Sequence, residues 1–354
     1  MWPDDRLIRL LGVAHPVIQA PMAGASTPAL AAAVANAGGL GSIAAAMLDG
    51  EGLRDAVTET RRATNGPLNL NFFVHRPPAD DAAKAAAALD LLRPYYDDLG
   101  LGAMPAVKAL HFPFDEAMLE VVLELGPKVV SFHFGLPDAR LVARLRDAGI
   151  LVLSSATTVR EAQALEQGGA DLIVAQGFEA GGHRGTFDSS FEQAQVGTIA
   201  LVPQIVDAVS VPVIAAGGIA DGRGIAAAFA LGAAGVQLGT VFLNCPQSAI
   251  APVHRQALLE ARDEDTRLTD AFSGRPARGL ANRYIEEMAP HHGSLPDFPL
   301  MNTLTGPLRK ESAKRGSPDF VALWSGQAMG LNRETDATEL MEQLVTSARR
   351  ILGS

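Results

Sequence analysis

The sequence contains a single cysteine, an excess of acidic over basic residues and no long apolar run. With Cys245 alone, an internal disulfide and a cysteine-based zinc site are excluded. No stretch of about 18 apolar residues occurs, so we expect no membrane-spanning helix. The net charge of -10 argues against a nucleic-acid partner, because such proteins present basic patches to the phosphate backbone. The first residues, MWPDDRL, do not resemble a signal peptide, which favours a cytoplasmic location.

Hydrophobic residues make up 48% of the 354 residues, which is enough apolar matter for a large core. Eight short apolar runs alternate with Ala-rich, helix-favouring segments. Strands that are apolar throughout and linked by helices predict a parallel sheet covered on both faces. The eight predicted strands are residues 17–22, 40–45, 68–73, 129–135, 151–157, 172–177, 212–218 and 235–240.

Eight such units predict an α/β fold, a (β/α)8 TIM barrel, although an open doubly wound sheet would show the same local pattern. The spacing is interrupted twice. Residues 74–128 are too long for one crossover and are expected to form an extended excursion within the barrel. Residues 243–317 lose the periodicity and are expected to form a smaller inserted cap domain that binds substrate. The barrel is then formed by residues 1–242 and 318–354.

Polar and small residues recur at the ends of the predicted strands, where a barrel of this kind places its active site. Gln19, Asn71, Gln176 and Gln237 are examples. Their amides and the exposed backbone can hydrogen-bond a planar polar heterocycle. We therefore expect the binding site at the C-terminal ends of the strands.

Two glycine-containing turns follow the last two predicted strands, at Gly217–Gly218 and Gly239–Thr240. Glycines let the backbone approach a phosphate, and a helix N-terminus offers free N–H donors, so these turns predict a phosphate site. Tight turns without a ligand are the structural alternative. Residues 39–44 and 222–227 mimic a dinucleotide fingerprint, but the first precedes a strand and the second lacks a ribose-binding acid, so no Rossmann site is predicted.

The loop after the sixth strand carries His183 between glycines, where it can lie over a bound ring. Imidazole titrates near neutral pH and can take a proton from carbon, so His183 is the expected catalytic residue. His133 and Arg184 are candidates for the substrate pocket, with a buried, hydrogen-bonded histidine as an equal interpretation of His133. The other histidines are expected at the surface or in the cap, and no spacing indicates a metal. They are His15, His75, His111, His254, His291 and His292.

Six segments together resemble the nitronate monooxygenase family, formerly called 2-nitropropane dioxygenases. The AGGHRG loop is similar to that of its class I members. A seventh segment, LWSGQ (323–327), is similar to the family's C-terminal tail. The six segments are QAPMAG (19–24), GGLGS (38–42), NLNFF (69–73), AQGFEAGGHRG (175–185), AAGGIADGRG (215–224) and VQLGTVF (236–242).

This resemblance implies noncovalently bound FMN and His183 as the catalytic histidine. It implies oxidation of alkyl nitronates, such as propionate 3-nitronate, by O2 to a carbonyl compound and nitrite through one-electron flavin chemistry. Nitroalkanes are a further expected substrate, and a homodimer is compatible with these features. The expected FMN contacts are Ala20, Pro21, Met22, Asn71, Gln176, Gly181, Gly217, Gly218, Gln237, Leu238, Gly239 and Thr240.

Three other functions are consistent with parts of the same pattern. An FMN-dependent NAD(P)H enoyl-acyl carrier protein or quinone reductase shares the barrel motifs and is the main alternative. An IMP dehydrogenase-like enzyme needs a cysteine after the sixth strand, which Cys245 does not supply. A flavin-storing barrel without catalysis would not need His183. Arg275 and Arg278 either attract a substrate carboxylate or pin the cap to the barrel.

Overall fold

Eight parallel strands form the centre of the molecule in a computed structural model that describes residues 2–109 and 113–353. Their order is β1-β9-β8-β6-β5-β4-β3-β2, and a parallel bridge between Ile18 and Leu40 joins the two end strands. The sheet therefore closes, and the predicted (β/α)8 barrel is confirmed. The strands are β1 (Val17–Gln19), β2 (Gly41–Ala44), β3 (Leu68–Phe73), β4 (Val129–His133), β5 (Leu151–Ala156), β6 (Leu172–Gln176), β8 (Val213–Ala216) and β9 (Gly235–Leu238).

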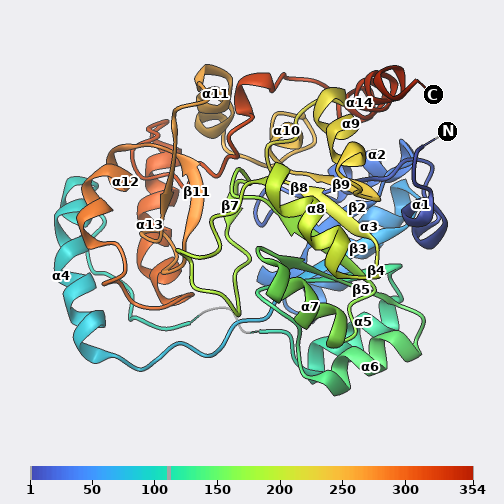
Figure 1. Cartoon of the computed structure of the whole chain (residues 1–354). Coiled ribbons are helices and arrows are strands. Elements are labelled where there is room, and N and C mark those ends of the chain that lie inside the picture. The colour runs from blue at the N-terminus through green and yellow to red at the C-terminus, as the bar shows by residue number, and fades with distance from the viewer. Residues whose placement is uncertain (1, 110–112, 354) are drawn as a thin grey trace.

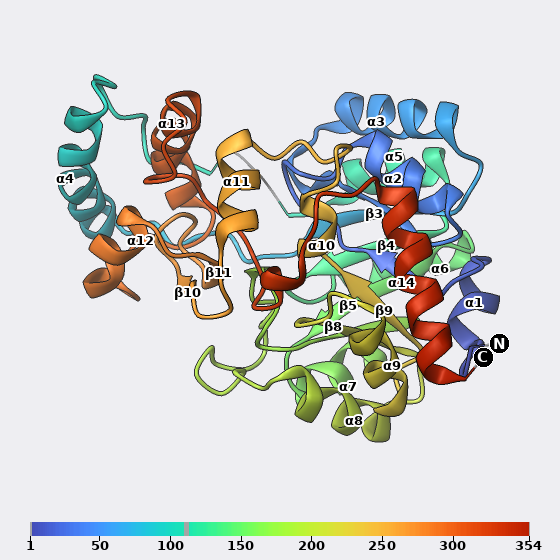
Figure 2. The same cartoon turned by 90° about the horizontal axis from the view of Figure 1, so that it is seen from above.

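Helices surround this barrel on its outside (Figure 2). Many begin at a Thr or Asp whose side chain accepts an N–H of the first turn, as Thr27, Asp49 and Asp221 do, so the local sequence sets where they start. The helix α1 (Arg6–Leu11) closes the N-terminal end of the barrel with Leu7 and Leu11. The outer helices are α2 (Pro28–Asn36), α3 (Gly50–Ala63), α5 (Glu116–Leu125), α6 (Ala139–Asp147), α7 (Val159–Gln167), α8 (Thr198–Ala208), α9 (Gly222–Ala230) and α14 (Ala337–Leu352).

A second body lies beside the C-terminal ends of the strands (Figure 1). Its three-stranded antiparallel sheet has the order β10-β11-β7, from β10 (Thr266–Thr269), β11 (Ala277–Leu280) and β7 (Gly182–His183). Since β7 belongs to the loop after β6, this sheet ties the barrel to the cap. The helices of the cap are α12 (Arg283–Met288) and α13 (Leu300–Lys314).

The excursion of residues 74–128 is shared between the two bodies. Its first helix, α4 (Ala82–Asp98), packs in the cap: Leu92 and Tyr96 lie in one apolar cluster with Phe272, Tyr284 and Leu304. Its second helix, α5, packs on the barrel. Part of the excursion thus completes the core of the cap, which the predicted range 243–317 did not include.

Shorter elements complete the chain. The helices α10 (Thr240–Leu243) and α11 (Pro252–Glu260) lie between β9 and the cap sheet, and the 3-10 turn η3 (Met329–Leu331) lies between the cap and α14. The 3-10 turn η1 (Ala45–Met47) follows β2 in the barrel, and η2 (Ala289–His291) follows α12 in the cap. Throughout the part of the chain that the structure describes, every helix is too short or too polar to cross a membrane.

The glycine-rich segment 38–42, where no dinucleotide site is predicted, allows close packing of a strand against a helix. A methyl group at Gly41 would lie 2.1 Å from the carbonyl oxygen of Ala31 in α2. We predict that Gly41→Ala lowers the free energy of unfolding by about 3 kcal/mol, because helix and strand must separate. Urea denaturation measures it. Gly330→Ala, which meets no atom within 4 Å, is the control; equal midpoints for the two variants would contradict the prediction.

Candidate active site

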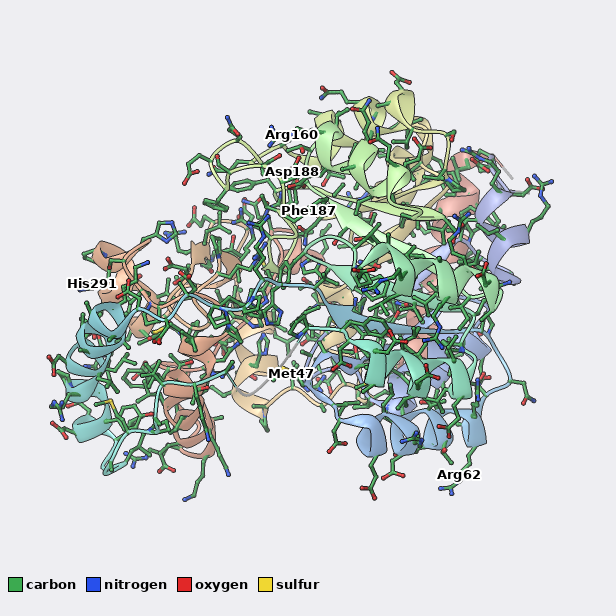
Figure 3. All side chains as sticks on the ribbon, turned by 90° about the horizontal axis from the view of Figure 1, so that it is seen from below. Met47, Arg62, Arg160, Phe187, Asp188 and His291 are labelled. Carbon is green, nitrogen blue, oxygen red and sulfur yellow. The ribbon has the colours of Figure 1, made fainter. Side chains whose placement is uncertain are left out.

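One cavity of about 600 Å³ opens at the C-terminal ends of the barrel strands and reaches the cap. This is the size of a small-molecule or cofactor pocket. The ends of strands β3 to β6, β8 and β9 line it together with residues of α13 and of the C-terminal segment. Met47, which also lines the cavity, marks its edge between the two bodies in Figure 3.

Glycine backbone forms one end of this cavity. Gly217 and Gly218 have φ angles of 109° and 70°, which only glycine adopts readily. A methyl group at Gly239 would be in ordinary contact with Ala20 and Met22, at 3.6 and 3.8 Å, so this position is not closely packed. The short helix α10 begins at Thr240, and the N–H of Phe242 in its first turn donates to the Gly239 carbonyl at 2.9 Å. These features suit a phosphate group.

Gln237, which lines the same end of the cavity, contributes a buried hydrogen-bond acceptor. Its side-chain oxygen Oε1 is buried and has no partner among the described residues. A buried amide oxygen without a donor is costly, so a ligand N–H at this place would be favourable.

His183 lies over the cavity in the short strand β7. The register Ala277↔His183 with β11 sets its backbone, and its Nε2 atom lies 2.9 Å from the hydroxyl of Ser273. The rings of Phe298 and Trp324 have centroids 5.5 and 5.7 Å from its own. Burial, followed by the charges of His133, Arg275 and Arg309, lowers the pKa of His183 to about 3. A pKa this low favours the neutral ring, whereas an unperturbed imidazole titrates near neutrality.

His133 uses both of its ring nitrogens within the protein. Its Nε2 atom lies 3.1 Å from the carbonyl oxygen of His183, which can only accept, so Nε2 carries the proton. Its Nδ1 atom then accepts from the Ser155 hydroxyl at 2.5 Å. Burial lowers the pKa of His133 to about 4. His133 lines the cavity, as expected for a residue of the substrate pocket. Both of its nitrogens have protein partners, as expected for a buried, hydrogen-bonded histidine.

Arg184 does not line the cavity, in contrast to the expectation that it belongs to the substrate pocket. Its guanidinium is buried and donates to the carbonyl oxygens of Gln176, Gly177 and Ala194 at 3.2, 2.6 and 2.9 Å. Because neighbouring residues of the extended β7 segment point in opposite directions, Arg184 faces away from the cavity that His183 faces. Its role here is to hold the loop.

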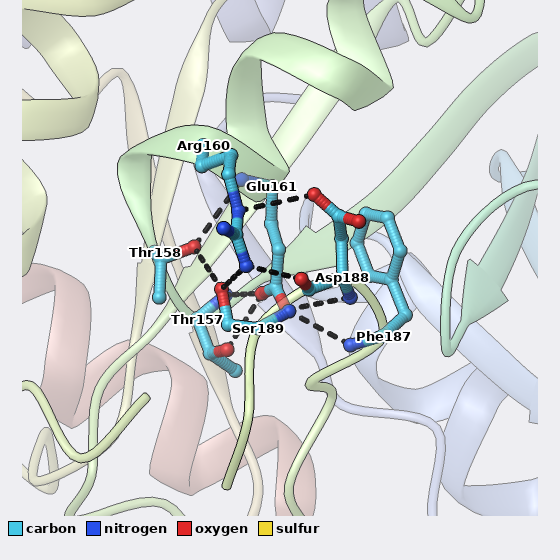
Figure 4. A network of polar contacts seen from close by, with 7 residues as sticks. All are labelled: Thr157, Thr158, Arg160, Glu161, Phe187, Asp188 and Ser189. Carbon is cyan, nitrogen blue, oxygen red and sulfur yellow. Dashed lines mark hydrogen bonds and ion pairs between the residues drawn. The ribbon is translucent and has the colours of Figure 1, made fainter. Parts of the chain in front are cut away.

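Glu161 binds the next part of this loop, residues 187–189 (Figure 4). Among the described residues, no Lys or Arg forms an ion pair with its carboxylate. One oxygen accepts the N–H groups of Phe187, Asp188 and Ser189, and the other accepts from the N–H and hydroxyl of Thr157. Such multiple donation stabilises a buried carboxylate. Figure 3 shows Phe187 and Asp188 beside Arg160, whose Nε pairs with Asp188 at 3.1 Å.

Arg275 and Arg278 connect the cap to the same loop. The Arg275 guanidinium lies 3.8 Å from the centroid of the Phe134 ring and donates to the Thr186 carbonyl. Arg278 donates to the Phe178 carbonyl through Nε and Nη2 at 3.1 and 3.0 Å. Neither lines the cavity, so the geometry favours the pinning role over contact with a substrate.

Arg309 is a cation of the cavity that the sequence pattern did not indicate. It comes from α13 and lines the cavity beside Asn302, whose carbonyl accepts from Nη2 at 3.1 Å. Its Nε atom is buried without a partner, and it has no carboxylate ion pair within the described ranges. Burial lowers the pKa of Arg309 from its usual value. An anion would satisfy this charge.

His254 lies within residues 243–317, the range expected to form the cap, and not at the surface. It is buried, lines the cavity and hydrogen-bonds the Trp324 carbonyl at 3.2 Å, a place at the cavity that the sequence pattern did not indicate. His75 is also buried, while His111 lies outside the described residues. His291 lies in the outer part of the cap (Figure 3). Within residues 2–109 and 113–353 no group of His, Cys, Asp and Glu could hold a metal ion.

The structure brings the expected FMN-contact residues together at one cavity, with one difference. Leu238 points outward into the apolar cluster between sheet and helices, because it alternates with Gln237 along β9. The expected contacts that line the cavity are Ala20, Pro21, Met22, Asn71, Gln176, Gly181, Gly217, Gly218, Gln237, Gly239 and Thr240.

Residues 4–347 match the family model described as nitronate monooxygenase. The chain belongs to the nitronate monooxygenase family. It is 47% identical over 348 residues to a nitronate monooxygenase of Pseudomonas aeruginosa, covering 98% of this chain and 99% of the relative. A probable nitronate monooxygenase of Staphylococcus aureus is 41% identical, with 99% of both chains covered. The resemblance noted in the sequence is thereby confirmed, and the chain is an enzyme of this kind.

Solved structures agree with this membership. A nitroalkane oxidase from Streptomyces ansochromogenes has a TM-score of 0.91 at 40% identity, covering 98% of this chain and 99% of that one. FabK from Thermotoga maritima has a TM-score of 0.77 at 29% identity, covering 100% and 98%. Members of the nitronate monooxygenase family and FabK thus share the architecture described above.

Three buried imidazoles should make this monooxygenase-family member lose stability in mild acid. Burial lowers the pKa of His133, His183 and His254 to about 4, 3 and 4, below the value of roughly 6.5 in an unfolded chain. Protons then favour the unfolded state as pH falls through 6.5 toward 4, at a cost of roughly 2 kcal/mol for each residue at pH 5. Urea denaturation at pH 7 and pH 5 measures the loss.

A His254→Gln variant removes one of these groups and should show a smaller loss between the two pH values. Carboxylates titrate mainly below this window, so they contribute little to the difference. Equal stability of the parent chain at pH 7 and pH 5 would show that these imidazoles are not kept neutral by burial.

Proposed function

We propose that the chain oxidises alkyl nitronates, including propionate 3-nitronate, with bound FMN and O2 to a carbonyl compound and nitrite. The observation that carries the proposal is a cavity that joins the glycine-lined end to His183, whose ring keeps one nitrogen without a partner among the described residues. The names of the relatives, nitronate monooxygenase and nitroalkane oxidase, support the same reaction.

The cavity residues fit FMN in three respects. Gly217, Gly218 and Gly239 line the cavity, and the positive φ angles of the first two form the kind of glycine turn that binds a phosphate through its backbone. Gln237 presents a buried acceptor without a partner, and an isoalloxazine ring carries an N–H. The volume of about 600 Å³ can hold such a ligand together with a small substrate. A flavin bound there would supply the redox chemistry, while the protein positions the substrate and shapes the field around it.

His183 would act through its free ring nitrogen. With a neutral nitroalkane, the nitrogen takes the proton from the α-carbon, the C–H bond breaks, and its electron pair moves onto the nitro group to give a nitronate. With a nitronate already formed, the incoming negative charge raises the affinity of the ring for a solvent proton. The resulting N–H then donates to a nitronate oxygen. Both routes use the neutral ring that burial maintains.

Arg309 would neutralise the second charge of a substrate such as propionate 3-nitronate. Its guanidinium faces the cavity without a carboxylate partner among the described residues, so a substrate carboxylate would complete it. The nearby apolar rings of Phe298 and Trp324 can cover a short alkyl chain between the two charged groups. This arrangement favours small, anionic nitronates.

Anaerobic absorption titrations test the reaction and the main alternative. We predict that flavin bands of the purified protein change on addition of propyl nitronate and do not change on addition of NADH. Bleaching by NADH alone would overturn the proposal in favour of an NAD(P)H-dependent reductase, the main alternative from the sequence. His183→Gln should lower kcat/KM for nitronates by about 100-fold while flavin stays bound; full turnover would remove His183 from the reaction.

The role of Arg309 is tested by selectivity. We predict that Arg309→Met lowers kcat/KM for propionate 3-nitronate by about 10- to 100-fold, the value of a buried charge-assisted hydrogen bond. The value for propyl nitronate, which has no carboxylate, should change by less than about 3-fold, since this pair of bonds is absent. Arg309→Lys is the matched control and should retain part of the preference. Equal losses on both substrates would show a general role in folding or access.

A further inference from the structure

Among the residues that the structure describes, the ring of His183 has one hydrogen-bond partner, and that partner belongs to the cap. Ser273 is buried in the turn between β10 and β11, and its hydroxyl oxygen lies 2.9 Å from Nε2 of His183. The pairing of β7 with β11 fixes the backbone of His183 next to this turn. The two residues are distant in sequence, so only the docked cap provides this contact.

The single proton of the Ser273 hydroxyl already has an acceptor. Oγ donates to the carbonyl oxygen of Arg275 at 3.1 Å, and the N–H of Arg275 points back at the same Oγ at 3.3 Å. A hydroxyl that donates its proton to Arg275 accepts at His183, and in that arrangement Nε2 of His183 carries the ring proton.

The other nitrogen of His183 is left for the cavity. Nδ1 has no hydrogen-bond partner in residues 2–109 and 113–353. It is also not among the fully buried polar atoms that lack a partner in these ranges, so it is not closed off from the cavity. His183 lines the cavity, so this lone pair is open to a ligand. His133, by contrast, has both nitrogens engaged, with Ser155 and with the carbonyl of His183.

We propose that Ser273 is a positioning residue that holds His183 in the Nε2–H tautomer and so presents Nδ1 as the proton acceptor of the site. The tautomer follows from the contacts alone, and the proposal rests on the proposed function only for the use of Nδ1 in the reaction. The same contact suits the protonated ring, because Nε2–H donates to Ser273 before and after Nδ1 gains a proton. Protonation therefore requires no rearrangement of the cap.

Removal of the Ser273 hydroxyl should remove the preference of His183 for the Nε2–H tautomer. In Ser273→Ala, Nε2–H would be buried without an acceptor, which is unfavourable. The Nδ1–H tautomer, with its proton solvated in the cavity, then becomes populated. A ring with Nδ1–H offers a donor where the reaction needs an acceptor.

Nitrogen NMR of the holoenzyme labelled with 15N-histidine tests the tautomer directly. The His183 signals are identified by their loss in His183→Gln. We expect a protonated shift for Nε2 and an unprotonated shift for Nδ1 in the parent chain, a change toward protonated Nδ1 in Ser273→Ala, and the parent pattern in Ser273→Thr. Protonated Nδ1 in the parent chain, or an unchanged pattern in Ser273→Ala, would overturn the proposal.

Kinetics then separates positioning from general damage to the fold. Ser273→Ala should lower kcat/KM for propyl nitronate by about 10-fold or more, and Ser273→Thr should restore it to within about 3-fold. Ser294→Ala removes an exposed hydroxyl of the cap and is the control with unchanged turnover. Equal losses in the Ala and Thr variants would show that packing, not the hydroxyl, matters. If no variant oxidises nitronates but the NMR pattern holds, the proposed function fails while the tautomer stands.

Discussion

The site depends on the carbonyl oxygen of His183. Gln176 donates to it at 2.9 Å from the end of β6, and His133 donates to it at 3.1 Å from the end of β4. Two strands of a rigid barrel thus hold one backbone atom of a long loop, so the ring keeps a fixed place relative to the strand ends. Arg184 and Glu161 extend this control along the loop through backbone groups. A catalytic ring on a loop can be as well positioned as one on a strand when its backbone is bound in this way.

Burial and nearby positive charge act on the pKa of His183 in the same direction. Burial lowers it most, followed by the charges of His133, Arg275 and Arg309. An entering anion opposes that field and favours protonation of the ring, because Coulomb interactions are strong where water is excluded. We therefore expect binding of an anion to be coupled to uptake of a proton.

Much of the barrel could be predicted from the sequence, because its signals are local. Each strand is a short apolar run, and residues such as Gln176 and Gln237 stand where the run ends. The orientation of Arg184 could not be predicted, since a loop has no fixed period until β7 pairs with β11. The placement of α4 in the cap depends on contacts of Leu92 and Tyr96 with residues far along the chain. His254 is polar on a short helix, a pattern that surface residues share, and its contact with the carbonyl of Trp324 joins positions 70 residues apart.

The two ends of the cavity depend on different features of the sequence, one on backbone conformation and the other on side chains. The glycine end is made of backbone, and its requirement is conformational, so Gly217 and Gly218 are visible in the sequence. The cap end is made of side chains that α13 projects, with Asn302 and Arg309 two turns apart on one face. A change in those side chains alters charge and shape at one end and leaves every barrel strand in place. In the proposed function, the reaction would depend on the barrel and its loop, whereas the choice among nitronates would depend on α13.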